Sequence, residues 1–245
     1  MTPVAGAFGT GDGGAGAARF DEFAERYARF NQLRDRLLPG IADWLAGHAA
    51  RGDRALDLGC GDGLHAARLA DRYRRVVAVD LSGSLLELAR SRHPRPNLNY
   101  QRRGVLEVTP ERDGRFDAVV SVNSLHHVGP LAEVLARVRR LVAPGGWLVV
   151  ADIVDPGGWG DRDWHVDQAF AGARSFYQLA GGDPEVAADT LRLLLHPGWL
   201  AMTTTDIPPT RERFRRLAGA ALPGAVFTDD LHPVMCGVSW QSPPG

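Results

Sequence analysis

From residue 54 onward, short apolar runs alternate with segments of helical periodicity. The helical segments cover 64–72, 83–92 and 130–141. The apolar runs predict strands at 55–58, 76–79, 116–122 and 147–154, with a weaker strand at 98–101. Strands that alternate with helices form a parallel sheet covered on both faces. The run AVVSV is typical of a strand buried on both sides. The turn at 143–146 is expected to break the chain before the last of these strands.

The residues before this alternation have a different pattern. Residues 1–18 are rich in Gly and Ala without an apolar period, which predicts a disordered arm. An amphipathic helix is predicted over 19–38 and a second helix over 41–50. The first helix carries apolar residues at spacings of three and four: Phe20, Phe23, Tyr27, Phe30, Leu33 and Leu37. Residues 19–50 are therefore interpreted as an N-terminal helical cap on a core that spans 51–154.

After the core, residues 155–205 interrupt the alternation. Two helical segments, 162–180 and 184–196, are rich in aromatic residues, and the stretch 196–199 is interpreted as a helix stop. About 50 residues cannot easily support a core of their own, so we predict a helical lid rather than a second domain. Residues 206–245 then supply a helix and the last two strands.

Three alternate glycines, Gly59, Gly61 and Gly63, follow the first predicted strand of the core. Glycine lets a ligand lie against bare backbone, and the start of the following helix offers free N–H groups to an anion. Asp80 ends the next strand about 20 residues later, where a carboxylate can bind both hydroxyls of a ribose. A dinucleotide site would need its third glycine at position 64, which is Leu64. The spacing therefore disfavours a nicotinamide dinucleotide.

The heptapeptide DLGCGDG at 57–63 matches the E/DxGxGxG motif and resembles that of the class I S-adenosylmethionine-dependent methyltransferases. Asp80, the strand FDAVV, the turn at 125–128 and the break at 143–146 follow in the family's order. The resemblance is to the small-molecule type found in ubiquinone biosynthesis. It implies an α/β, Rossmann-like fold with a seven-stranded, mostly parallel sheet, helices on both faces, and a lid after strand five.

The resemblance also implies which residues hold S-adenosylmethionine. The glycine loop would pass beneath the methionine and ribose, Asp57 would anchor the amino end, and Asp80 would bind the ribose. The set implied by the resemblance is Tyr27, Asp57, Gly59, Cys60, Gly61, Gly63, Asp80, Leu81, Leu106 and Asn123. Tyr27 is equally interpreted as a core residue of its helix. The segment 102–107 lacks the family's usual acid for the adenine amino group, so Glu107 or backbone carbonyls would replace it.

Histidines are the natural candidates for a general base. His126 and His127 follow the fourth predicted strand, at the sheet edge where such folds bind ligands, and His165 lies in the lid. Either of the first two could instead cap a helix or pack beneath the loop, and Asp152 either faces the site or ends the strand pairing. Candidate substrate-binding residues are Trp164, Phe170 and Tyr177. No spacing of His, Asp and Glu suggests a metal site.

The amino-acid composition excludes some kinds of catalysis and disfavours some kinds of partner. All 28 basic residues are Arg, so lysine-dependent catalysis is excluded. The net charge of −1 argues against a general nucleic-acid binder. The two cysteines form no disulfide framework, and no apolar run is long enough for a membrane span. Without a signal-peptide pattern, the expectation is a cytoplasmic monomer or homodimer that binds neither nucleic acid nor membrane.

The favoured hypothesis is in-line methyl transfer to a small-molecule acceptor, such as a secondary metabolite. One alternative is an enzyme of the same fold repurposed for pericyclic, cyclisation or decarboxylation chemistry. Another is a non-catalytic binding module. A nucleic-acid or protein methyltransferase is disfavoured, because the residues at 123–126 read NSLH rather than Asn/Asp-Pro-Pro-aromatic.

Overall fold

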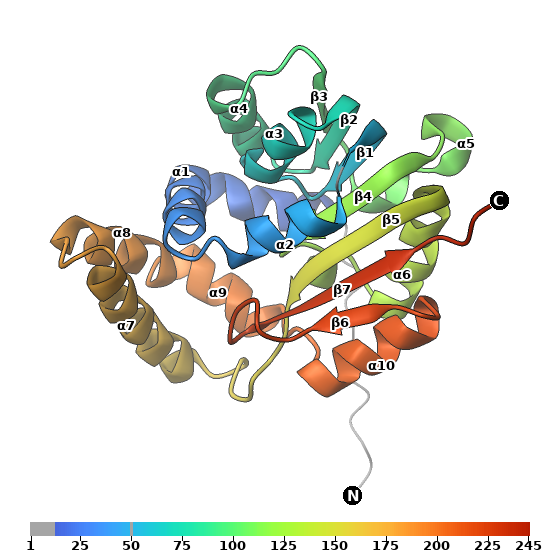
Figure 1. Cartoon of the computed structure of the whole chain (residues 1–245). Coiled ribbons are helices and arrows are strands. Elements are labelled where there is room, and N and C mark those ends of the chain that lie inside the picture. Colours follow the sequence, from blue (N-terminus) through green and yellow to red (C-terminus); the bar gives the residue numbers. More distant parts are fainter. Residues whose placement is uncertain (1–12, 50) are drawn as a thin grey trace, which may run out of the picture.

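A single seven-stranded sheet forms the centre of the molecule (Figure 1). The computed structural model describes residues 13–49 and 51–245. Strands β1 to β5 are parallel, β7 runs antiparallel to β5, and β6 runs antiparallel to β7. The spatial order is β3-β2-β1-β4-β5-β7-β6, which confirms the predicted fold. The strands are β1 (Gly52–Leu58), β2 (Tyr73–Asp80), β3 (Leu98–Arg102), β4 (Phe116–Val122), β5 (Val142–Ile153), β6 (Val226–Thr228) and β7 (Met235–Gln241).

Side chains that alternate along β1 supply both faces of the sheet. Leu56 and Leu58 pack into the cluster that includes residues of α6 (Leu131–Val138) and α10 (Arg211–Ala221). Ala55 packs into the cluster that includes α2 (Gly40–His48) and α3 (Leu64–Ala70). Because both faces are covered, the strands have no polar face, as their continuous apolar sequences predict.

The remaining elements connect or cover this core. Helix α1 (Gly13–Leu37) packs on α8 and α9, and Figure 1 shows α7 to α9 together at the end of the molecule beside α1. Among the helices of the described residues, none is long and apolar enough to cross a membrane. The other elements are α4 (Gly83–Arg92), α5 (Pro110–Asp113), α7 (Arg162–Leu179), α8 (Pro184–Leu194), α9 (Pro197–Thr205), η1 (Val105–Glu107), η2 (Leu125–His127) and η3 (Arg139–Leu141).

Three expectations from the sequence are corrected. Helix α1 begins at Gly13 rather than at 19, a start that local propensity does not explain, since three of the residues 13–18 are glycines; residues 1–12 of the predicted arm lie outside the described residues. The stretch 196–199 does not simply end a helix, since His196 caps α9, with Pro197 at its first position. The turn at 143–146 lies inside β5, where an irregularity opposite 116–118 accommodates it.

Candidate active site

The loop between β1 and α3 is built from residues with left-handed backbone. Gly59, Gly61 and Gly63 have φ of 69°, 53° and 81°. Two backbone hydrogen bonds tie the loop to β2, from Gly59 N and Cys60 N to the Val79 carbonyl oxygen at 2.9 and 3.0 Å. Residues that carry a side chain rarely adopt these φ values, because the conformation costs free energy. The alternate glycines therefore produce the tight loop that the motif predicts.

Two alanine substitutions should separate the roles of these glycines. A Cβ at position 63 would lie 2.5 Å from the Tyr100 hydroxyl and 2.8 Å from Ala89 Cβ, whereas at position 61 it would meet only Tyr27 Cε1 at 3.8 Å. We expect Gly63→Ala to lower the free energy of unfolding by about 2–5 kcal/mol, from strain and overpacking. Gly61→Ala should cost only the strain, about 1–2 kcal/mol. Urea denaturation measures both, and equal losses would contradict the steric argument.

Asp80 joins the glycine loop to the turn after β2. Its Oδ2 accepts a hydrogen bond from Gly61 N at 2.8 Å, and its Oδ1 accepts one from Ser82 N at 2.9 Å. Burial raises the pKa of the Asp80 carboxyl, although these N–H donors oppose the shift. Leu81, the next residue, is half-buried. The carboxyl end of β2 therefore presents a carboxylate beside an apolar side chain.

A group of buried oxygen atoms surrounds the loop. Asn31 Oδ1, Asp57 Oδ2, Asp62 Oδ2 and Asn123 Oδ1 have no hydrogen-bond partner among the described residues. Asn31 Nδ2 donates to Asp62 Oδ1 at 3.5 Å, and Asn123 Nδ2 donates to the Tyr27 hydroxyl at 3.4 Å. We call Asn31, Asp57, Asp62 and Asn123 the acceptor cluster. Unpaired buried acceptors are costly, so this cluster favours a ligand that brings donors or positive charge.

Burial perturbs both acids of the acceptor cluster. It raises the pKa of Asp57 to about 7, and the negative charges of Asp80 and Asp62 add to the shift. It raises the pKa of Asp62 to about 6, opposed by the hydrogen bond from Asn31. Arg34 lines the same small cavity as Tyr27 and the loop. Sequence reasoning missed Asn31, Arg34 and Asp62, although Asn31 lies one turn after Tyr27 on α1.

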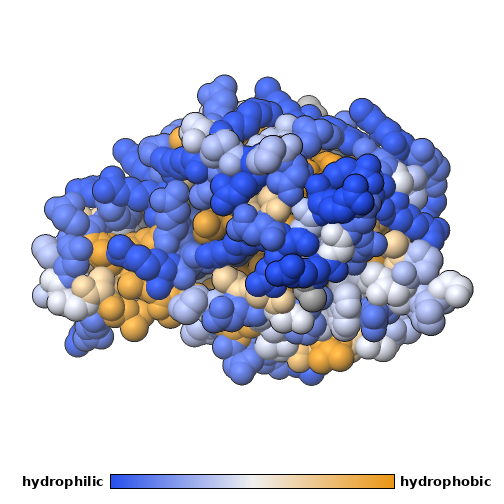
Figure 2. Space-filling model, turned by 45° about the horizontal axis from the view of Figure 1, so that its top comes forward, coloured by the Kyte–Doolittle hydropathy of each residue, from blue (hydrophilic) through white to orange (hydrophobic). Residues whose placement is uncertain are grey.

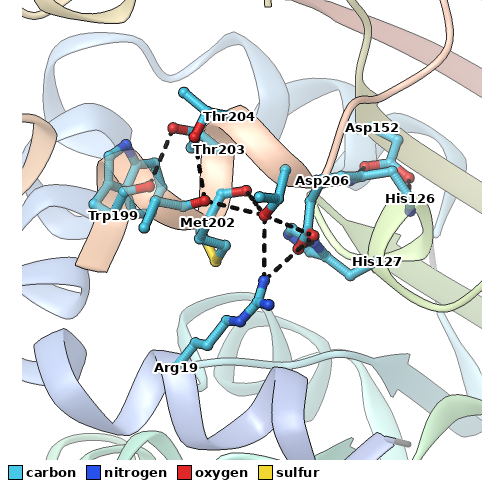
Figure 3. Close-up of polar contacts among 11 residues, drawn as sticks. Arg19, His126, His127, Asp152, Trp199, Met202, Thr203, Thr204 and Asp206 are labelled. Carbon is cyan, nitrogen blue, oxygen red and sulfur yellow. Dashed lines mark hydrogen bonds and ion pairs between the residues drawn. The ribbon is translucent and has the colours of Figure 1, made fainter. Parts of the chain in front are cut away.

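Two histidines lie side by side where β4 ends (Figure 3). The Asp152 carboxylate on β5 accepts from the backbone N of His126 at 3.0 Å and lies 2.7 Å from its Nδ1. His127 Nδ1 lies 3.1 Å from Oδ2 of Asp206, the residue that follows α9. The two ring centroids are 3.8 Å apart. Figure 3 shows these two His–Asp pairs next to each other, with Arg19 pointing toward Asp206. Asp152 therefore faces His126 while it also takes part in the pairing of β5 with β7.

Comparisons with known proteins match the part of the chain that carries the glycine loop. A family model described as a methyltransferase domain matches residues 56–150. An uncharacterized methyltransferase of Mycobacterium tuberculosis is 42% identical over 101 residues, which cover 41% of this chain and 51% of that protein. The ubiquinone biosynthesis O-methyltransferase of Paracidovorax citrulli is 32% identical over 144 residues, which cover 56% of this chain and 60% of that protein.

Residues 56–150 of the chain therefore match a methyltransferase domain, and the chain is similar to proteins named as methyltransferases. A solved structure of DhpI in complex with SAM and HEP has the same fold, with a TM-score of 0.62 at 22% identity, over 94% of this chain and 98% of that one. The chain spans only about half to three fifths of the length of the curated relatives it matches, 51% and 60% for these two.

The structure gathers some of the predicted site residues and separates others. Tyr27, the glycine loop, Asp80, Asn123 and the histidine pair lie at the carboxyl edge of the sheet. His165 is buried elsewhere: its Nε2 lies 2.7 Å from the Trp159 carbonyl oxygen, and its ring packs on Trp159 and Trp164. These contacts all lie within the segment 155–205.

Two of the three predicted substrate-binding residues of α7 lie at the surface, whereas Trp164 is half-buried and packs on Trp159 and His165. Phe170 is 55% exposed and Tyr177 is 42% exposed. Figure 2 shows apolar residues gathered at the end of the molecule where α7 and α8 lie. Leu106, on η1, is also exposed, and Glu107 Oε2 accepts from Gly104 N at 2.6 Å. The aromatic ring that packs edge-on against His127 is Phe20 of α1, with centroids 5.7 Å apart. Sequence reasoning placed Phe20 on the apolar face of α1 but gave it no role in the site.

Proposed function

We propose that this protein transfers a methyl group from S-adenosylmethionine to a small-molecule acceptor such as a secondary metabolite. The observation that carries the proposal is the convergence of three features at one sheet edge. These are the glycine loop with Asp80, the acceptor cluster, and the paired histidines. The curated relatives support it by name, since they are methyltransferases.

The residues present fit the cofactor. S-adenosylmethionine carries a sulfonium and an ammonium group, which suit the unpartnered oxygens and two acids of the acceptor cluster. Asp80 would accept from the ribose hydroxyls, and Leu81 and Leu106 would pack on the adenine. The Arg34 guanidinium on the cavity wall would pair with the methionine carboxylate. When bound, the cofactor supplies an electrophilic methyl group to an oxygen, nitrogen or carbon nucleophile.

His126 is the best-placed general base. Because Asp152 accepts from the backbone N of His126 and lies 2.7 Å from its Nδ1, the ring is held with Nδ1–H toward the carboxylate. In that tautomer the lone pair on Nε2 can accept a proton from the acceptor. A buried carboxylate partner also stabilises the imidazolium that forms. The site therefore suits an acceptor whose nucleophilic atom carries a proton.

The pH dependence of cofactor binding tests the acceptor cluster. The folded-state pKa values of Asp57 and Asp62 are raised to about 7 and about 6. Stability that depends on these groups is therefore present below their unfolded pKa near 4 and is lost as the pH rises through 6 to 7. A cationic ligand offsets this loss of stability. The increase in protein stability on ligand binding should therefore be larger at pH 8 than at pH 5. Each pKa unit relieved is worth about 1.4 kcal/mol, or roughly 3–6 °C in Tm.

Thermal unfolding with and without S-adenosylmethionine at the two pH values measures this difference. Asp57→Asn should remove much of the pH dependence. A ligand-induced change in Tm that is the same at pH 5 and pH 8 in the wild type would contradict a cation site at Asp57 and Asp62.

Calorimetry followed by product analysis tests the function itself. We expect the wild type to bind S-adenosylmethionine and to form one demethylated cofactor for each methylated small molecule. Failure to bind the cofactor would overturn the proposal. Binding and turnover without demethylated cofactor would support a repurposed enzyme instead. Steeply salt-dependent RNA binding would support a nucleic-acid substrate. The proposal describes a cytoplasmic monomer or homodimer.

A further inference from the structure

The two adjacent histidines are held by carboxylates from different parts of the molecule. Asp152 belongs to β5, within the sheet, and its side chain is 1% exposed. Asp206 follows α9, the last helix of the segment 155–205, and its side chain is 31% exposed. The His126–Asp152 contact therefore persists whatever the covering helices do. The His127–Asp206 contact exists only while α9 lies over the site.

Helix α1 reaches the same carboxylate from the other side of the site. Arg19 Nη1 lies 3.4 Å from Asp206 Oδ1 and 3.4 Å from Thr205 Oγ1. Phe20 packs edge-on against the His127 ring. Segments distant in sequence, from α1, η2 and the end of α9, thus meet at Asp206 (Figure 3).

A kink divides the start of α1 from the rest of the helix. Phe23 has φ of −129° and ψ of 20°, which are not helical and mark a kink. Kinks localise bending in a helix. On the N-terminal side of Phe23, Arg19 contacts Asp206, and Asp21 accepts hydrogen bonds from Ser82 Oγ and Ser84 N at 2.5 and 3.1 Å. The ion pair between Arg29 and Asp189 of α8, at 2.7 Å, holds the segment that follows Phe23. Breaking the contacts of Asp206 therefore leaves the start of α1 held by Asp21 and removes only the ion pair with Arg19 that lies beside His127.

We propose that Asp206 is a positioning residue that orients His127 toward the bound acceptor only when α9 and the start of α1 cover the site. This proposal rests on the proposed function. It gives the lid a role in orienting a histidine, in addition to enclosing the acceptor. The carboxylate holds Nδ1–H of His127, which leaves Nε2 free to contact the acceptor beside His126. The second His–Asp pair is thereby complete as long as α9 and the start of α1 cover the site.

The charges around His127 are consistent with this arrangement. The titratable or charged groups that face it are His126, Asp152, Asp206 and, through Asp206, Arg19. Burial lowers the pKa of His127, and the Asp206 carboxylate opposes that shift. The hydrogen bond with His127 lowers the pKa of Asp206, so its charged form is favoured.

Asp206→Asn and Asp206→Ala test the role, with Asp189→Asn as the matched control. Asp189 also joins the segment 155–205 to α1 through an ion pair, but it does not contact a histidine. The first readout is the His127 imidazole in NMR spectra of the protein without ligand. We expect Asp206→Ala to lower the His127 pKa by about one unit and to reduce its Nδ1–H tautomer. Asp206→Asn should lower the pKa but retain part of the tautomer preference, and Asp189→Asn should change neither.

The second readout is the split between kcat and KM. We expect Asp206→Ala to lower kcat by about 10- to 100-fold and to change KM for the acceptor by less than about threefold, because orientation rather than binding is lost. An equal loss of kcat in Asp189→Asn would show that lid docking alone matters and would overturn the proposal. Unchanged His127 spectra in Asp206→Ala would also overturn it. If the wild type binds no cofactor, the proposed function is wrong. The NMR spectra still decide whether Asp206 orients His127.

Discussion

Asp80→Ala is expected to weaken S-adenosylmethionine binding by at least about 100-fold, because hydrogen bonds to a charged group contribute about 1.5–3 kcal/mol each and a ribose offers two. The same carboxylate accepts from Gly61 N and Ser82 N, so its loss also loosens the glycine loop against the turn after β2. Both effects act in the same direction on affinity. Isothermal titration calorimetry of wild type and variant measures the change.

Asp117→Ala is the matched control for this variant. Asp117 also accepts two backbone hydrogen bonds, from Asp53 N at 2.7 Å and Arg54 N at 2.9 Å, but at the opposite end of the sheet. We expect it to lower Tm while leaving cofactor affinity within about twofold of wild type. Asp80→Asn should fall between wild type and Asp80→Ala. If Asp80→Ala bound the cofactor as tightly as wild type, the ribose would have to lie elsewhere.

His126→Ala is expected to lower kcat by about 10²- to 10⁴-fold, which is the usual contribution of a general base. Asp152→Asn should lower kcat in the same direction, because it removes the charge that holds Nδ1–H and stabilises the imidazolium. Neither residue belongs to the proposed cofactor set, so cofactor affinity should remain near the wild-type value. Steady-state kinetics with parallel calorimetry separates the two quantities.

His48→Ala provides the comparison for His126. The ring of His48 is held by its own helix, with Nδ1 2.9 Å from the Trp44 carbonyl oxygen, and it lies on α2 away from the paired histidines. We expect His48→Ala to retain kcat. A wild-type kcat in His126→Ala would show that the acceptor needs no base at this position, and the base assignment would be withdrawn.

The local sequence pattern was sufficient to predict the fold and the glycine loop. The apolar runs predicted the strands of the parallel sheet, and the alternate glycines with Asp80 predicted the loop beside β2. These features depend on neighbours in sequence and on the rule that parallel strands end at one edge. The helix α9 and the bounds of β5 were missed or misplaced, because capping and a local irregularity overrode simple turn signals. The start of α1 at Gly13 was also misplaced, because its Gly-rich sequence does not indicate a helix.

Contacts between distant segments decided the rest of the site. Nothing in the residues around His126 and His127 shows that one is held by Asp152 and the other by Asp206, because the partners are 26 and 79 residues away. The same holds for the acceptor cluster, in which Asn31 of α1 meets Asp62 of the loop. Sequence periodicity therefore determined which elements form and which loop can hold the cofactor. Only the packing of α1 and α9 over the sheet decided which side chains share a site, because burial and pairing of polar groups depend on the whole fold.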